Sequence, residues 1–272
     1  MEFTQLLKVM IERGASDLFI SAGARPSIKV DGTLKPLTKE PLKPSQARSL
    51  VYSTMTDKQT SEFDSTHECN FAISAPGLGR FRVSAYFQRN SPGMVLRRIN
   101  ATIPSFEELN LPPVMKDLSM SKRGLILFVG GTSTGKSTSL ASMIDYRNRH
   151  SRGHIITIED PIEFIHEHKE SIVTQREVGI DTDSFEVALR NTLRQAPDVI
   201  LMGEIRTHEL MKYGLAFSET GHLCMATLHA NNANQALDRI VSFFQPEHHE
   251  PLWMELSLNL KAIVAQQLLP TK

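Results

Sequence analysis

The sequence predicts an α/β protein built in two parts, a small α+β module followed by a larger α/β domain. In the first hundred residues, short strands and helices are separated by Gly and Pro turns, whereas later short apolar strands alternate with helices. That alternation implies a parallel sheet covered by helices on both faces. A chain of 272 residues is long enough for two domains. We place them at residues 1–100 and 116–272, joined by a linker at 101–115.

The first part carries both helical and strand signals. Apolar residues at helical spacing predict a helix over residues 3–13, which Gly14 ends. Residues 45–63 predict two more helices, with Ser45 and Thr56 as candidate N-caps. Strands are expected at 17–23, 27–34 (with a tight turn at Asp31–Gly32), 68–74, 79–88 and 92–99. The stretch that follows contains three prolines and no sustained period, so we expect it to be a linker and a hinge.

The second part has the pattern of a doubly covered sheet. Asp183 or Ser184 is the expected N-cap of one of its helices. Strands are expected at 124–130, 154–160, 198–204 and 222–230, and helices at 136–149, at 184–195 and between the last two strands.

The stretch "FVGGTSTGKSTSL" from Phe128 to Leu140 fits the phosphate-loop pattern. It follows an apolar strand and opens a helix, so backbone N–H groups would point at phosphates. Lys136 can reach the β- and γ-phosphates, and the Ser137 hydroxyl can bind Mg²⁺. An ordinary glycine-rich turn is the alternative. The predicted nucleotide-binding residues are Gly130, Ser133, Thr134, Gly135, Lys136, Ser137 and Thr138.

Hydrolysis also needs acidic groups at neighbouring strand ends. Glu204 ends "DVILMGE", where it can organise Mg²⁺ and water. "TIEDPIEF" supplies Glu159, Asp160 and Glu163 after another strand. Alone, such a cluster is more often a solvated loop, but ligands of α/β sheets gather at the carboxyl ends of strands. We assign Glu163 as the base or water-positioning residue, because Pro161 stiffens the turn before it.

Two histidines flank the last predicted strand, His222 and His229. Positions seven apart on a continuous strand face opposite sides, so the pair is not expected to bind one metal. From the residues alone, a structural and a functional role remain equally open for each.

Composition excludes several classes. Thirty basic residues balance thirty acidic ones, so no overall field attracts nucleic acid or an anionic membrane. The cysteines Cys69 and Cys224 could pair, but reduced buried thiols are the expectation. No apolar run approaches the ~20 residues of a membrane helix. The N-terminus lacks the features of a secretory signal, so we expect a cytoplasmic protein.

Four motifs in order, "GGTSTGKST", "TIEDPIEF", "DVILMGEIR" and "GHLCMATLHANNA", resemble the secretion-ATPase superfamily. Within it the chain is similar to the PilT/PilU family of twitching-motility retraction ATPases, and the stretch around "HIITIEDPIEFIHEHKESIVTQREVG" favours the PilU branch. The resemblance covers almost the whole chain. It implies a PAS-like N-terminal domain, a RecA-like ATPase domain, and a homo-hexamer that binds ATP and Mg²⁺ between its domains.

The resemblance also assigns roles to single residues. The family's Asp-box glutamate falls on Glu163, its Walker B glutamate on Glu204, and its His-box histidines on His222 and His229. Its N-domain arginines, which reach the nucleotide, fall on Arg82 and Arg97, with Arg80 nearby. Without the resemblance these arginines would be read as a solvated face. The implied catalytic residues are thus Glu163, Glu204, Arg82, Arg97, His222 and His229, with Ser137 and Glu204 serving Mg²⁺.

The chain departs from the family in two places. Ser133 and Thr134 replace the usual inner Gly-Ser of the loop, and Gly131 replaces a proline. Serine at a position of positive φ costs about 1 kcal/mol, so we expect intact binding and slower catalysis. The chain ends at "IVAQQLLPTK", where family members continue into a helical C-terminal region that we expect to be missing.

The resemblance implies a motor for type IV pilus retraction, peripheral at the inner membrane. Its expected partners are a PilT-type ATPase and an inner-membrane pilus platform protein, and no nucleic acid. Three alternatives stay open: an assembly or type II secretion ATPase, a DNA-translocating RecA-like motor, and a ring partner that hydrolyses ATP poorly. Two cysteines cannot build the four-cysteine zinc module common in the first. The balanced charge argues against the second.

Overall fold

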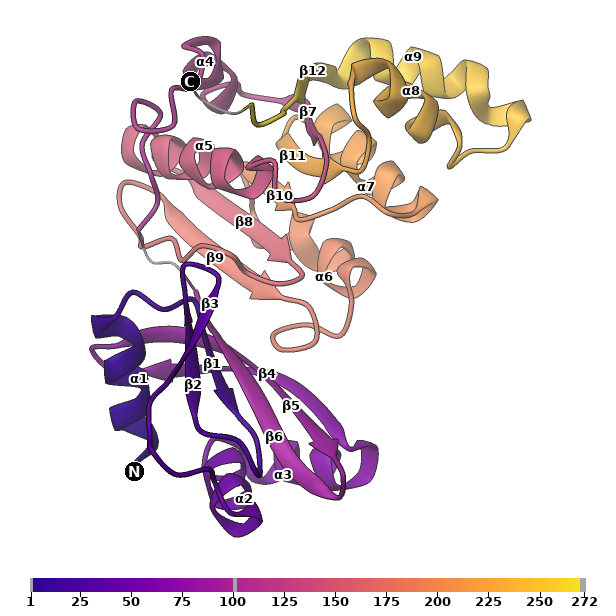
Figure 1. Ribbon diagram of the computed structural model, residues 1–272. Helices are drawn as coiled ribbons and strands as arrows, with labels where there is room; N and C mark the ends of the chain where they lie inside the picture. Colours follow the sequence, from indigo (N-terminus) through magenta and orange to yellow (C-terminus); the bar gives the residue numbers. More distant parts are fainter. Residues whose placement is uncertain (1, 100–101, 270–272) are drawn as a thin grey trace. The chain divides into compact units, whose positions relative to one another are not determined.

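The computed structural model describes residues 2–99 and 102–269 (Figure 1). The fold is mixed α/β, and contacts divide the chain into two compact units, Met1–Asn100 and Ala101–Lys272. Ala101, where the predicted linker begins, and residues 270–272 of the predicted second domain lie outside the described residues. Each unit is described by itself below.

The first unit is an antiparallel sheet with helices packed on one face. Its strands follow the order β3-β2-β1-β6-β5-β4. Leu7, Val51 and Phe63, one from each helix, share a buried core with Val83 and Leu96 of the sheet. The elements are α1 (Phe3–Glu12), β1 (Asp17–Ile20), β2 (Ser27–Val30), β3 (Thr33–Pro36), α2 (Pro44–Tyr52), α3 (Asp57–Thr66), β4 (Glu68–Ala75), β5 (Gly79–Gln88) and β6 (Ser91–Arg98).

Most of these elements were predicted. The tight turn expected at Asp31–Gly32 is present, and it divides the stretch 27–34 between β2 and β3. Thr56 is the N-cap of α3 as predicted, and its side chain accepts a hydrogen bond from the Gln59 N–H. The Ser45 prediction is wrong: α2 begins at Pro44, because proline suits the first helical turn.

The second unit is a parallel sheet in the order β12-β7-β11-β10-β8-β9. Its elements are α4 (Val114–Ser119), β7 (Gly124–Val129), α5 (Lys136–His150), β8 (His154–Glu159), β9 (Ile172–Glu177), α6 (Phe185–Thr192), the 3₁₀ turn Leu193–Gln195, β10 (Val199–Met202), α7 (His208–Glu219), β11 (Leu223–Leu228), α8 (Ala233–Val241), the 3₁₀ turn Pro246–His248, α9 (His249–Asn259) and β12 (Leu260–Ala265). Ser184 caps α6, one of the two predicted candidates.

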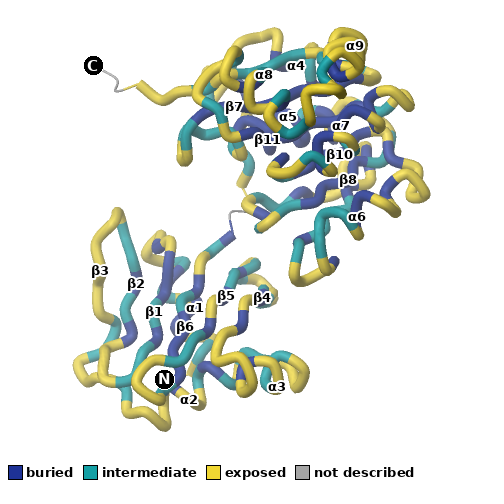
Figure 2. The backbone as a smooth tube through the Cα atoms, turned by 90° about the vertical axis from the view of Figure 1, so that its right-hand side faces the viewer, coloured by how far each residue is buried: buried dark blue, intermediate teal, exposed yellow. Residues whose placement is uncertain are grey.

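Both faces of this sheet are covered, as the alternation predicts. Leu125, Leu127 and Val129 of β7 pack into a core with α6, α7, α8 and α9, whereas Ile126 and Phe128 face a second core with α4 and α5. Strands β7, β10 and β11 are buried along their whole length (Figure 2). Because the strands are parallel, their carboxyl ends share one edge, where ligands of such sheets bind.

Much of the predicted linker packs on the second unit. Phe106 and Met115 are buried in the core against α5, and the Ser142 hydroxyl donates to the Pro104 carbonyl at 2.5 Å. The hinge motion expected for residues 101–115 stays a prediction. Among the helices of residues 2–99 and 102–269, none has the length and apolarity needed to cross a membrane.

Candidate active site

The phosphate loop joins β7 to α5 at the carboxyl edge of the sheet, as its sequence predicts. Gly130 has φ +150°, and a Cβ there would lie 2.4 Å from the Gln266 carbonyl oxygen. Gly135 has φ +91°, and its Cβ would lie 2.9 Å from Gln266 Nε2. Both positions therefore require glycine. Gln266 follows β12 directly, and its Oε1 also accepts from the Ser139 hydroxyl at 3.0 Å.

Side chains of the loop hydrogen-bond within the loop. The Lys136 ammonium donates to the carbonyls of Gly130 and Gly131, at 2.9 and 2.6 Å. Burial lowers the pKa of Lys136, and the charge of Glu204 opposes that shift. Thr134 Oγ1 donates to the Gly131 carbonyl at 2.9 Å. Ser133 has φ +63°, the left-handed conformation that the departure from glycine puts under strain.

Glu204, after β10, has both carboxylate oxygens engaged. The Arg206 guanidinium donates to Oε2 at 2.7 and 2.8 Å, and His229 Nε2 lies 2.8 Å from Oε1. The hydrogen bond to Glu204 raises the pKa of Arg206. Arg206 also lies 3.9 Å from Asp160, so it joins the acidic groups that follow two strands.

Glu163 is an exposed residue of the segment after β8. With Ser137 of the phosphate loop it lines a cavity of about 30 Å³, whose other polar lining residues are Glu159, His166 and Thr227. The structure thus brings the loop and the first acidic motif together. Within the described residues, no side chain donates a hydrogen bond to the Glu163 carboxylate, unlike that of Glu204.

The two histidines take different places. His229 follows β11 at the carboxyl edge and lies against Glu204. His222 precedes β11, where its Nδ1 lies 3.1 Å from Thr220 Oγ1 and 3.2 Å from the Phe217 carbonyl oxygen. A strand rises ~3.3 Å per residue, so β11 puts His222 on the order of 20 Å from His229. Of these two histidines, His229 lies beside an acidic residue of the edge and His222 lies at the other end of the strand.

The predicted arginines lie in the first unit. Arg82 and Arg97 are directly opposite each other on β5 and β6, and Arg97 pairs with Asp17 at 2.8 Å. Within the described residues, Arg82 has no hydrogen bond or ion pair and the buried Arg80 Nε has no partner. Arg97 therefore already has an anionic partner in Asp17.

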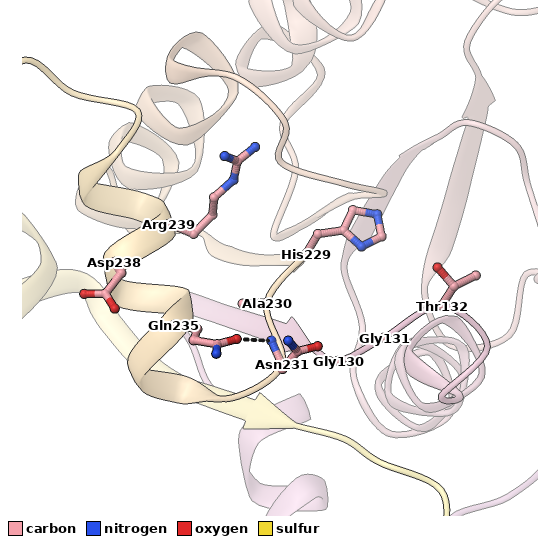
Figure 3. A pocket seen from close by; sticks show the side chains of 9 residues that line it. All are labelled: Gly130, Gly131, Thr132, His229, Ala230, Asn231, Gln235, Asp238 and Arg239. Carbon is pink, nitrogen blue, oxygen red and sulfur yellow. Dashed lines mark hydrogen bonds between the residues drawn. The ribbon is translucent and has the colours of Figure 1, made fainter.

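A pocket of about 540 Å³ opens beside the first half of the loop (Figure 3). The His229 ring lies between Thr132 and the start of α8, and the Asn231 N–H donates to Gln235 Oε1 at 3.1 Å. The other lining residues are Gly130, Gly131, Ala230, Asp238 and Arg239. The loop and the histidine segment therefore border one open space.

The donor set fits a metal held mainly by nucleotide oxygens. Within the described residues, no group of three His, Cys, Asp or Glu side chains could hold an ion. Mg²⁺ is commonly bound by one or two protein groups together with phosphates, and Ser137 and Glu204 can serve in that way.

Cys69 and Cys224 are both free and buried, as the sequence predicts, and burial raises the pKa of the Cys224 thiol to about 12.

Two residues near the loop escaped the sequence reasoning, Arg206 and Gln266, and Glu159 was predicted only as one member of the acidic cluster. Burial raises the pKa of Glu159 to about 7, against hydrogen bonds from Thr157 and Gln175 that lower it. The signal available for each was its position at the carboxyl end of a strand: Glu159 ends β8, Gln266 directly follows β12, and Arg206 lies in the segment after β10.

Known proteins resemble this chain along its whole length. Residues 2–272 match the family described as Type II/IV secretion system protein. The chain is 65% identical to the type IV pilus ATPase PilU of Pseudomonas aeruginosa over 271 residues, which are 100% of this chain and 71% of PilU. It is 44% identical to the type IV pilus retraction ATPase PilT of the same species over 269 residues, or 99% of this chain and 78% of PilT.

A solved structure is also similar. The structure of the pilus retraction motor PilT with bound ADP superimposes with a TM-score of 0.95 at 45% identity, covering 99% of this chain and 79% of that one. The fold agrees with that of this PilT structure. As an ATPase of the pilus-retraction type, this chain belongs to the Type II/IV secretion system protein family, among its PilT/PilU-type members.

Proposed function

We propose that this chain hydrolyses Mg·ATP at the edge formed by the phosphate loop, Glu163 and Glu204, and that a ring of six copies uses the energy to draw pilins out of a type IV pilus. The observation that carries the proposal is one cavity lined by both Ser137 and Glu163. It supports a site in which the group that binds phosphate and the group that takes a proton lie side by side.

The two glutamates have separate roles in this proposal. Glu163, whose carboxylate accepts no side-chain hydrogen bond within the described residues, orients the attacking water and takes its proton. Glu204, held by Arg206 and close to His229, fixes negative charge beside the metal position. Mg²⁺, when bound, neutralises charge on the β- and γ-phosphates.

Lys136, Ser137 and the loop amides bind phosphate, together with Gly130, Ser133, Thr134, Gly135 and Thr138. We propose that Arg82 and Arg97 supply positive charge to the nucleotide, the part that the family resemblance implies for them. His229 senses the γ-phosphate next to Glu204. The proposed part of His222 rests on the family resemblance alone.

We also propose the fold type of each unit and the assembly of the chain. The first unit is PAS-like and the second RecA-like. The ring is a homo-hexamer, peripheral at the inner membrane, and works with a PilT-type ATPase and a pilus platform protein. The similarity to the type IV pilus ATPase PilU supports the place of this chain in a pilus system.

A second candidate function is a ring partner that binds nucleotide but hydrolyses it slowly. The positive φ of Ser133 favours it, because strain in the loop reduces the fit around the phosphates. Both candidates share the binding site and differ only in rate.

Steady-state ATP hydrolysis by the purified chain tests the proposal, with and without a PilT-type ATPase and over a range of protein concentrations. We expect activity that rises steeply with concentration and is lost in Lys136→Ala, which keeps its fold. Activity that appears only with the added ATPase would select the second candidate. Tight, salt-sensitive binding of DNA in a filter assay would contradict both.

A further inference from the structure

The segment that carries Glu163 is held by side chains of β8 and β9. Residues 161–166 lie outside any named helix or strand. Glu177 Oε2 accepts a hydrogen bond from the Ile162 N–H at 3.3 Å. Gln175 Nε2 donates to the Phe164 carbonyl at 2.9 Å. Gln175 Oε1 accepts from the His166 N–H at 2.7 Å. The backbone is therefore fixed on both sides of Glu163.

Glu159 completes this arrangement at the end of β8. The backbone N–H of Glu163 acts as a donor toward the Glu159 carboxylate. Its Oε1 accepts from Thr157 Oγ1 at 2.6 Å and from Gln175 Nε2 at 3.3 Å. Gln175 thus contacts both Glu159 and the segment after Glu163. The Glu163 side chain stays exposed while its backbone is held.

We propose that Glu159, Gln175 and Glu177, here called the Glu163 cradle, are positioning residues that fix Glu163 for proton transfer from the attacking water. The proposal rests on the role of Glu163 as base. The geometry gives the reason: a base on an irregular segment needs external support, and a misplacement near 1 Å costs about 100-fold in rate.

The cradle also couples the reaction to pH through Glu159. The titratable groups on the surrounding elements are Lys136 on α5, Asp160, Glu163 and His166 after β8, Glu177 on β9, and Glu204 and Arg206 after β10. Of these, Glu163 is the one whose charge raises the pKa of Glu159. Ionised, Glu159 accepts more strongly from the Glu163 amide and so holds the backbone of that segment more firmly. The turnover number then rises as pH passes through about 7.

Glu159→Gln tests this directly, because glutamine keeps an oxygen for the Glu163 amide but carries no charge. Gln175→Ala removes the contacts to Phe164 and His166. Glu167→Gln, on the exposed part of the same segment, is the matched control. The measurements are kcat and KM for ATP from pH 6 to 9, affinity for a fluorescent ADP analogue, and thermal unfolding.

We expect kcat to fall roughly 10- to 100-fold in Gln175→Ala with KM and ADP affinity little changed. Glu159→Gln should flatten the rise of kcat near pH 7, and Glu167→Gln should behave as the parent chain. Should Gln175→Ala not fold, the isosteric Glu159→Gln still decides the matter. An unchanged pH profile in Glu159→Gln, or losses of kcat and ADP affinity in parallel, would overturn the cradle. Full hydrolysis by Glu163→Gln would instead overturn the base assignment itself.

Discussion

The segments around Glu204 and Glu163 both follow buried parallel strands, yet they hold their carboxylates in opposite ways. Glu204 has its side chain fixed by the Arg206 guanidinium, with His229 close by, and little of it is exposed. Glu163 has its backbone fixed and its carboxylate open. A carboxylate with both oxygens engaged is suited to hold charge in place, whereas an open one can accept a proton. The difference separates an electrostatic role from a basic one.

Replacing the two glutamates is the strongest way to break this comparison. Glu163→Gln should lower kcat by about 10²- to 10⁴-fold, the usual contribution of a general base, without loss of stability. Glu204→Gln should also slow hydrolysis, but with a loss of about 1–3 kcal/mol of unfolding free energy, because Arg206 loses its charged acceptor. Kinetics and urea unfolding of both variants check this. Equal effects of both variants on stability would remove the distinction.

Glu159 gives the next largest effect, seen in stability against pH. Its pKa, raised to about 7 from an ordinary 4.5, means that the folded chain holds a proton that the unfolded chain releases. Its contribution to stability is therefore full below pH ~4.5 and is lost as pH rises through about 7, at most about 3 kcal/mol.

Urea unfolding at pH 6.5 and 8.5 measures the last part of that loss, about 1 kcal/mol. Glu159→Gln should lose less stability than the parent chain between these two values. His166, whose pKa burial lowers to about 4, acts in the opposite direction but only between about 4 and 6.5, so it does not interfere. The same loss in both proteins would contradict the buried carboxyl.

Arg206 sharpens the comparison by testing the clamp on Glu204 alone. Arg206→Gln should cost about 1 kcal/mol of stability, a modest value because Arg206 is more than half exposed. It should lower the rate of ATP hydrolysis more than it lowers the affinity for ADP. Arg152→Gln breaks an exposed ion pair with Glu170 and serves as the control, with almost no effect expected. Identical losses of unfolding free energy in the two variants would show that the Arg206–Glu204 ion pair contributes no more than an exposed surface pair.

The sequence could predict what depends on neighbouring residues. The phosphate loop, the apolar strands and the Thr56 cap follow from local pattern, and the site residues at strand ends follow from the parallel sheet. Strand β9 was missed because "IVTQRE" is half polar, and so its side chains Gln175 and Glu177 could not be placed beside Glu163. Gln266 reaches the loop because β12 pairs with β7 from more than 130 positions away, a contact that no local pattern contains.

Replacing Ser133 should give the smallest effect, and it tests the phosphate loop to which both glutamates are neighbours. With φ +63°, serine is strained there by about 1 kcal/mol, and glycine relieves the strain while losing part of that gain to its own chain entropy. Ser133→Gly should therefore gain up to about 1 kcal/mol, seen as a higher unfolding midpoint or as roughly fivefold tighter ADP binding or faster turnover. Ser133→Ala keeps the strain and removes only the hydroxyl, so it should stay near the parent chain. If alanine and glycine act alike, the hydroxyl and not the backbone controls the loop. If neither substitution changes stability, ADP binding or turnover, slow hydrolysis by this chain has its cause outside residues 132–134 of the loop.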